Sequence, residues 1–416
     1  MNISGVPKEF KSYFNRFRDL FSKRQFFYFT VYTYSLLVMP KEKKTVAQIS
    51  KAWIPPICRS SLEKLLSEVR WDFEKVLKRA RTQVIRKLSH LPKSKRSIEV
   101  VLDDSTLNKF GSKIFGAGWF KKKKNQLAAR GIQIVVLGVL FEDWFIPLDF
   151  RIYLNKELCK SFNMRFDTKL IQARKMIRNL KLPRGLSVRL MFDSWYLNTA
   201  VTEAAESRGW KWYSKCRHNR KVQWETKKDE QAIEEIRVDK YVKTIEWEKL
   251  YYETNHKNPA LVGHQRIGIL KKIGRVKLVI TSLKENGDSK VAFFCTNHTQ
   301  IQMVELVKKF ERRWKIEVYF RESKAHLALE KWYFRDVASV VHHLCLSLVA
   351  MITCFCIRFE QRKHGESLGT LGEFIREVQK QNQRRVLTSF LVRWNLEKIS
   401  PENHFKFNEL CESLGM

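Results

Sequence analysis

The feature that most restricts the fold is a long apolar segment near the C-terminal end of the chain. Residues 337–359 have a helical pattern that is apolar enough to suggest a membrane span. His342 and His343 lie inside this segment, and its flanks show no asymmetry of charge. We therefore expect a helix buried in a protein core, which requires enough other structure to surround it.

The composition leaves room for such a core. A chain of 416 residues is long enough for two to three domains. With 44% hydrophobic and 29% charged residues, it is not a disordered chain, a collagen or a disulfide-stapled mini-protein. The 8 cysteines include no CxxC pair and no zinc-finger spacing, so we expect free thiols. No signal peptide opens the sequence, which predicts a cytoplasmic protein.

The charge points to a polyanionic partner. The chain has 79 Lys and Arg against 43 Asp and Glu, a net charge of +36. A DNA or RNA backbone is the commonest partner of such a surface, and an anionic membrane surface is the alternative. The first 100 residues are the most basic part, with 22 basic and 8 acidic residues. We expect this part to contact the polyanion.

The first 95 residues have helical patterns. Phe10, Phe14, Phe17 and Phe21 recur at helical spacing, which is more typical of a core than of a base-stacking surface. Further helices are expected at 26–34 and 70–91. Two short helices at 45–50 and 60–66 flank a Pro-containing turn, in a weak helix-turn-helix pattern whose second helix Ser60 or Ser61 would cap. A polar linker at 91–96 predicts a domain boundary.

From Ser97 onward the pattern changes to alternating strands and helices. Apolar β-prone runs at 131–140 and 145–153 flank an acidic turn, Glu142-Asp143, and predict a hairpin. A β-rich segment is expected at 215–300, followed by one long helix. The other elements expected are strands at 98–102, 187–192 and 210–213 and helices at 169–180, 198–208 and 303–330.

Carboxylates follow two of these strands. Asp103 and Asp104 come at the end of the first strand, and Asp193 follows the strand at 187–192. Strand ends of an open α/β sheet face the ligand crevice, where converging carboxylates would hold a hard divalent ion such as Mg²⁺. Each Asp taken alone also fits an ordinary turn or helix cap. Asp103 and Asp104 point to opposite faces of a strand, and we favour Asp103 as the ligand because Asp104 would then start the turn.

A set of residues on the following helix has a specific spacing. Phe310, Arg313, Glu317 and Lys324 are separated by 3, 4 and 7 residues, which places them on about one sixth of a helix face. Glu317 would supply an oxygen ligand to a metal, and the two cations would hold phosphates. A solvated face with ion pairs is the alternative.

These residues resemble the bacterial insertion-sequence transposases of the DDE type that carry a Tyr–Arg–Glu–Lys signature. Phe310 replaces the tyrosine and lacks its hydroxyl. The resemblance implies an α/β fold, in which an RNase H-like mixed sheet is flanked by helices and carries a β-rich insertion. The implied parts are a helical DNA-binding domain at 1–95, the core at 96–213 and 301–360, the insertion at 214–300 and a helical tail at 361–416.

The resemblance also implies a function. The chain would be a transposase with nuclease and strand-transfer activity, moving its element by cut-and-paste in a bacterial nucleoid. Its partners would be transposon-end duplex DNA and target DNA, engaged by a homodimer, with no membrane. Asp103, Asp193 and Glu317 would be catalytic and, with Asp104, hold two Mg²⁺ ions, for which Mn²⁺ can substitute. The expected DNA contacts are Arg313, Lys324, Phe310, Arg321, Trp195, Trp314, Lys109, Arg217 and Arg220.

Two other functions fit the composition. A transposase relic kept for DNA binding alone would share the basic surface, although the acids are intact at all three sites. A peripheral membrane protein would bind lipid with no preference for nucleic acid.

Overall fold

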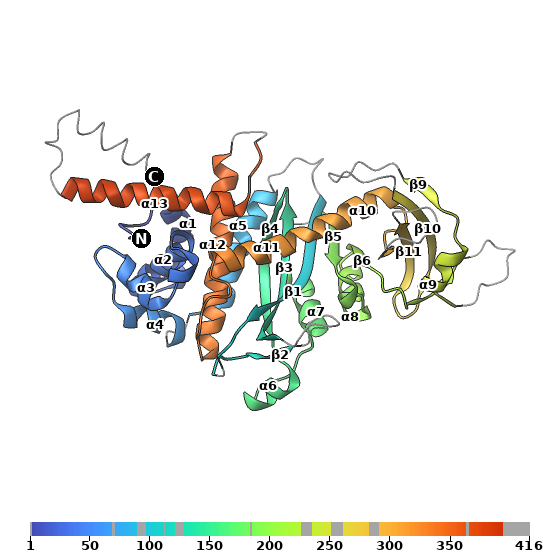
Figure 1. Ribbon diagram of the computed structural model, residues 1–416, viewed down its shortest axis with the longest axis horizontal. Coiled ribbons are helices and arrows are strands. Elements are labelled where there is room, and N and C mark those ends of the chain that lie inside the picture. The colour runs from blue at the N-terminus through green and yellow to red at the C-terminus, as the bar shows by residue number, and fades with distance from the viewer. Residues whose placement is uncertain are drawn as a thin grey trace.

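The computed structural model describes residues 2–68, 71–89, 97–111, 113–120, 129–183, 185–225, 235–250, 261–282, 291–362 and 366–393. Figure 1 shows its elements in chain order. The helices are α1 (Lys8–Phe14), α2 (Lys23–Val38), α3 (Val46–Ala52), α4 (Arg59–Ser67), α5 (Phe73–Ser89), α6 (Lys156–Ser161), α7 (Lys169–Asn179), α8 (Thr199–Glu206), α9 (Val238–Tyr241), α10 (Met303–Glu311), α11 (Lys315–His326), α12 (Val337–Gln361) and α13 (Leu371–Arg393). Short 3-10 helices are η1 (Asn15–Leu20), η2 (Lys41–Lys43), η4 (Ser194–Tyr196), η5 (Val242–Thr244) and η6 (Arg312–Trp314).

The strands form one twelve-stranded sheet. They are β1 (Ser97–Asn108), β2 (Gly118–Phe120), β3 (Ala129–Phe141), β4 (Trp144–Tyr153), β5 (Ser187–Phe192), β6 (Lys211–Lys215), β7 (Lys221–Trp224), β8 (Ile236–Arg237), β9 (Glu248–Leu250), β10 (Leu261–Leu270), β11 (Gly274–Ser282) and β12 (Ala292–Thr296). At the centre, β1 pairs antiparallel with β3 and parallel with β5, β4 joins β3 antiparallel, and β6 joins β5 parallel. β12 pairs with β6, so the β-rich segment continues the central sheet (Figure 1).

The first core strand is longer than expected. β1 continues through Asp103 and Asp104 to Asn108, and its backbone pairs with β3 along this length. The two aspartates lie opposite Val136 and Val135, in the middle of the pairing. The expectation that Asp104 starts a turn was therefore wrong, because the long apolar partner strand β3 keeps β1 extended. The predicted hairpin is present as β3 and β4, with Glu142 in the tight turn at a φ of 48°.

Helices cover both faces of the central sheet. α10 and α11 pack against β6, β4 and β1 and cross the sheet on the viewer's side in Figure 1. α7 packs against β3 and β4, and α8 packs against α7 and β6. The sheet is therefore enclosed between layers, and polar side chains on β1 meet helices on either side.

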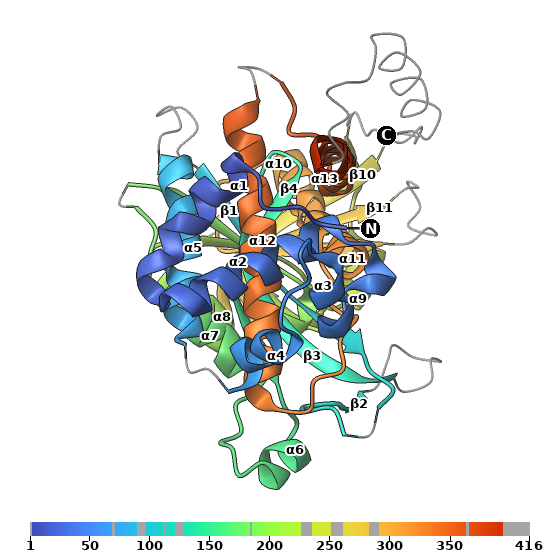
Figure 2. The same ribbon diagram turned by 90° about the vertical axis from the view of Figure 1, so that its left-hand side faces the viewer.

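The apolar helix α12 lies at the centre of the part of the structure that the N-terminal helices form. Among the described residues it is the one helix long and apolar enough to cross a membrane, and 94% of its most apolar window is buried inside the protein. Helices α1, α2, α4 and α5 pack around it, together with β4 (Figure 2). His342 stacks on Trp71 at 4.0 Å between ring centroids, and His343 bonds the Tyr32 hydroxyl at 2.8 Å. The predicted core helix is present.

Other expectations need correction. The helix expected at 303–330 is interrupted, because η6 separates α10 from α11 and α11 ends at His326. The second helix of the helix-turn-helix pattern starts at Arg59 with Cys58 as its N-cap, so Ser60 and Ser61 lie inside it. The predicted linker at 91–96 lies outside the described residues. The domain boundaries remain predictions.

Candidate active site

The site is centred on an arginine that joins two carboxylates from distant parts of the chain. The Arg313 guanidinium donates to Asp103 on β1 at 2.5 Å and to Glu317 at the start of α11 at 2.7 Å. Asp103 and Arg313 are largely buried, and Glu317 is partly exposed. Two acids separated by 214 residues in sequence thus share one cation.

Asp193 approaches the same point through the register of the parallel strands. Leu102 on β1 lies opposite Phe192 on β5, so the next residues along the two strands are Asp103 and Asp193. The pKa of Asp103 is raised to about 6, mainly by burial and in part by the negative charges of Asp104 and Asp193, against the opposing effect of Arg313. Asp193 therefore lies beside Asp103, which Arg313 links to Glu317.

Asp104 lies in a different environment from Asp103. Its carboxylate accepts hydrogen bonds from the Lys169 ammonium at 2.6 Å and the Tyr196 hydroxyl at 2.9 Å. Successive residues on a strand point to opposite faces, and Lys169 belongs to α7 rather than to α11. The structure therefore separates Asp104 from Glu317, and its predicted role as a ligand beside Glu317 does not fit this geometry.

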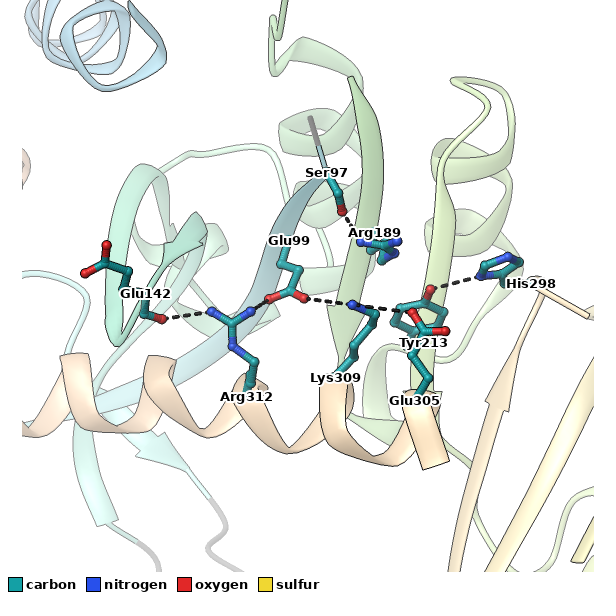
Figure 3. A network of polar contacts seen from close by, with 9 residues as sticks. All are labelled: Ser97, Glu99, Glu142, Arg189, Tyr213, His298, Glu305, Lys309 and Arg312. Carbon is teal, nitrogen blue, oxygen red and sulfur yellow. Dashed lines mark hydrogen bonds and ion pairs between the residues drawn. The ribbon is translucent and has the colours of Figure 1, made fainter. Parts of the chain in front are cut away.

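A second ionic contact fixes the helix against β1. Glu99 precedes Asp103 by four residues and faces the same side of β1, where it binds the Arg312 guanidinium and lies 3.8 Å from the Lys309 ammonium (Figure 3). Arg312 also donates to the Glu142 carbonyl oxygen at 2.9 Å. The consecutive residues Arg312 and Arg313 thus reach two acids on one strand, and both belong to the 3-10 turn η6.

The acids have the chemistry to hold a metal ion. Carboxylate oxygens are the donors that Mg²⁺ and Mn²⁺ prefer, and a buried carboxylate such as Asp103 requires a cation. In the arrangement described, no group of three Asp, Glu, His or Cys is placed to hold one ion within the described part of the chain. The cation between Asp103 and Glu317 is the Arg313 guanidinium, whose Nε is buried without a hydrogen-bond partner among the described residues. An ion between these two acids would take the place of this guanidinium.

The expected DNA contacts are of two kinds in the structure. Trp195, Trp314, Arg321 and Arg217 are exposed, as DNA contact would require. Lys324 is partly buried, donates to the Thr106 carbonyl oxygen at 2.7 Å and ties α11 to β1. Arg220 donates to the Leu197 carbonyl oxygen at 2.5 Å, behind Asp193.

Two of the expected DNA contacts do not fit. Lys109 is buried, and its ammonium donates to the carbonyl oxygens of Glu330 and Trp332 at 2.6 and 2.9 Å. Phe310 is buried against Phe294, with ring centroids 5.4 Å apart. The Arg313 guanidinium lies over the Phe310 ring, 5.6 Å from its centroid, so Phe310 shares a helix face with Arg313 as the spacing predicted. Neither side chain is available to a phosphate.

Sequence reasoning missed the partners of the carboxylates. Glu99 could have been found, because it shares a strand face with Asp103 at a spacing of four. Arg312 directly precedes Arg313, which was predicted as a site residue. Lys169 and Tyr196 give no signal in sequence, since only the packing of α7 and η4 brings them to Asp104.

The chain matches two family models. The family described as DDE superfamily endonuclease matches residues 16–234, which is more than half of the chain, and the family described as transposase DDE domain matches residues 167–353. No curated protein sequence matches. The solved cryo-EM structure of a piggyBac transposase synaptic complex with hairpin DNA matches at a TM-score of 0.48 and 12% identity, covering 94% of this chain and 76% of that chain.

Proposed function

The chain belongs to the DDE superfamily endonucleases, and on this premise we propose that it is a DNA transposase. It would cut DNA at the ends of its element and join the freed 3′ ends to target DNA, in a cut-and-paste reaction. The match to transposase DDE domains supports this proposal. The order β4-β3-β1-β5-β6, antiparallel and then parallel, supports an RNase H-like core.

The observation that carries the proposal is the link of Asp103 to Glu317 through Arg313, with Asp193 beside Asp103 on the neighbouring strand. These three acids would hold two divalent ions, which when bound activate the attacking oxygen and stabilise the leaving oxygen of a phosphodiester. Once released from the acids, Arg313 would bind a DNA phosphate group through two hydrogen bonds. Lys324 would bind the next phosphate of the DNA backbone. Asp104 would keep Tyr196 and Lys169 in place behind the site.

The finer assignments are also part of the proposal. The spacing of Phe310, Arg313, Glu317 and Lys324 supports the Tyr–Arg–Glu–Lys group of bacterial insertion-sequence enzymes, with phenylalanine for tyrosine. The basic residues 1–95 would bind the transposon end. A homodimer would hold two ends together and act on target DNA in the bacterial nucleoid.

The two adjacent aspartates offer a matched test. The substrate is a supercoiled plasmid that carries the gene with its native flanking DNA, incubated with the full chain and Mg²⁺ or Mn²⁺. Asp103→Asn should abolish nicking and excision, because it removes a charge that holds the ions. Asp104→Asn changes the same atoms one residue away and should retain cleavage.

The remaining acids extend the test. Asp193→Asn and Glu317→Gln should abolish cleavage and keep DNA binding, which depends on Lys and Arg. Near wild-type cleavage by the Asp103, Asp193 and Glu317 variants would reject the catalytic assignment. A chain that binds its flanking DNA and never cuts it would instead be a catalytically idle DNA-binding protein.

A further inference from the structure

Exposed aromatic side chains gather at one end of the central sheet. The three most exposed large apolar side chains among the described residues are Phe110, Trp119 and Tyr333, at 88%, 67% and 65%. Exposing aromatic rings to water to this extent is unfavourable, and isolated cases need no explanation. Their concentration in one region is the feature to be explained.

Backbone contacts bring Phe110 and Trp119 to the same place. Trp119 on β2 lies opposite Arg130 on β3. On the other side of Arg130, its carbonyl oxygen accepts a hydrogen bond from the Lys109 amide at 2.9 Å, and its guanidinium donates to the Phe110 carbonyl oxygen at 3.4 Å. Phe110 and Trp119 therefore both lie next to Arg130, one on each side of β3.

The buried Lys109 brings Tyr333 to this end of the sheet. The Lys109 ammonium lies 3.5 Å from the centroid of the Trp332 ring and donates to the Trp332 carbonyl oxygen. Phe110 follows Lys109, and Tyr333 follows Trp332, so each exposed ring is one residue from this contact. Figure 2 shows the segment that enters α12 passing near β2 at the lower end of the molecule.

The surroundings of the three rings are basic. Lys113, Lys331 and Arg335 are exposed, and Arg130 is partly exposed. The neighbouring acids are engaged elsewhere. Glu330 accepts the Asn108 amide and lies 3.9 Å from the Lys324 ammonium, while Asp336 caps α12 by accepting the Ser339 amide at 2.7 Å. Exposed aromatic rings among Lys and Arg are typical of surfaces that bind single-stranded nucleic acid.

The position of the rings relative to the carboxylates favours the same partner. Phe110 follows Asp103 by seven residues, a distance of about 23 Å along an extended strand. This is the length of roughly seven nucleotides of one strand at 3.4 Å each. Lys324 lies between the two places, at Thr106. A DNA strand leaving the carboxylates along β1 and α11 would pass Lys324 and reach the rings.

We propose that Phe110, Trp119 and Tyr333 form a stacking platform for unpaired bases of DNA. The inference rests on the proposed function for the identity of the polyanion as DNA. Stacking on aromatic rings tolerates any base sequence, so the platform would accept a strand opened near the cleavage point whatever its sequence. Duplex DNA does not present base faces and would not use the rings.

The test compares binding of single strands and duplexes by the full chain. The probes are a fluorescent 20-nucleotide oligothymidine and a fluorescent 20-base-pair duplex, measured by anisotropy at several salt concentrations. Phe110→Ala, Trp119→Ala and Tyr333→Ala should each weaken binding of the single strand by roughly five- to tenfold and leave duplex binding within about twofold. The slope of log affinity against log salt should not change, because no phosphate contact is lost.

Control variants separate stacking from other effects. Trp119→Phe and Tyr333→Phe keep a ring and should bind nearly as the wild type does. Phe27→Ala removes an exposed ring from α2 and should have no effect. Lys331→Ala should weaken both probes and lower the salt slope by about 1.

Two results would overturn the platform. Alanine variants that bind the single strand as the wild type does would show that the rings do not stack on bases. Variants that change the protein from dimer to monomer in sedimentation, with DNA affinity intact, would assign the rings to a second copy of the chain. Neither result affects the proposed function, which fails only if the wild type does not cut the plasmid.

Discussion

Glu99→Gln tests how the helix that carries Glu317 is held against the sheet. The Glu99 side chain is only 7% exposed and binds Arg312, whose side chain is 40% exposed. A hydrogen bond to a charged group contributes about 1.5–3 kcal/mol when buried. Arg312 keeps the Glu142 carbonyl oxygen and water, and Lys309 keeps Glu305, so the lower part of this range applies. We expect the variant to lose about 1.5–2 kcal/mol of unfolding free energy.

The expected effect on cleavage is larger than the effect on stability. Arg312 precedes Arg313, and loosening η6 would shift Arg313 and Glu317 relative to Asp103. A misplacement of about 1 Å can slow a reaction roughly 100-fold. We therefore expect plasmid cleavage to fall about 10- to 100-fold, with duplex binding unchanged.

Urea unfolding followed by tryptophan fluorescence measures the stability term, and the plasmid assay measures cleavage. Glu305→Gln is the control, because Glu305 is 47% exposed and its ion pair is with Lys309 of the same helix. It should change the free energy of unfolding by less than about 0.5 kcal/mol. If Glu99→Gln matched this control in both assays, the reasoning that this contact positions Glu317 would be refuted.

Three further predictions follow from single contacts. Burial lowers the pKa of Lys109 to about 7, so above that pH the folded chain binds fewer protons than the unfolded chain. In urea titrations, the unfolding free energy of the wild type relative to Lys109→Met should therefore rise by about 2 kcal/mol from pH 7 to 9. If the two proteins had the same pH dependence, the carbonyl oxygens would fully stabilise the ammonium. Gly138→Ala should lower the melting temperature strongly, because the added Cβ would overlap the Ile146 carbonyl oxygen and the Phe145 ring, whereas Gly185→Ala meets no neighbour and should suffer only from its positive φ. Lys324→Ala should weaken duplex binding, slow cleavage and lower the salt slope by about 1; an unchanged slope would limit Lys324 to tying α11 to β1.

The local sequence pattern was sufficient to predict those parts of the fold that depend on residues close together in the sequence. The hairpin of β3 and β4 was predicted from two apolar runs and an acidic turn. The placement of Asp103 beside Asp193 follows from the parallel pairing of β1 with β5, because each acid comes directly after the last paired residue of its strand. In both cases the information lies in the strands themselves.

Other features depend on contacts between residues that are far apart in the sequence, and these could not be predicted from it. A lysine in a basic segment predicts a phosphate contact. Lys109 is buried instead, because carbonyl oxygens more than 220 residues away in sequence accept hydrogen bonds from its ammonium. The 3-10 turn η6 has no breaker residue, and the contact of Arg312 with Glu99 accompanies it. The helical spacing nevertheless grouped Phe310, Arg313 and Glu317 correctly, because the Arg313 guanidinium lies over the Phe310 ring and donates to Glu317.

The position of α12 has a consequence for the order in which the chain acquires structure during synthesis. Helices α1, α2, α4 and α5 surround α12, yet about 250 residues separate Ser89 from Val337. At about 5–20 residues per second, the ribosome needs roughly 12–50 s to make that stretch. For this time Tyr32 and Trp71 lack their partners on α12, His343 and His342. The most basic hundred residues therefore complete their packing late.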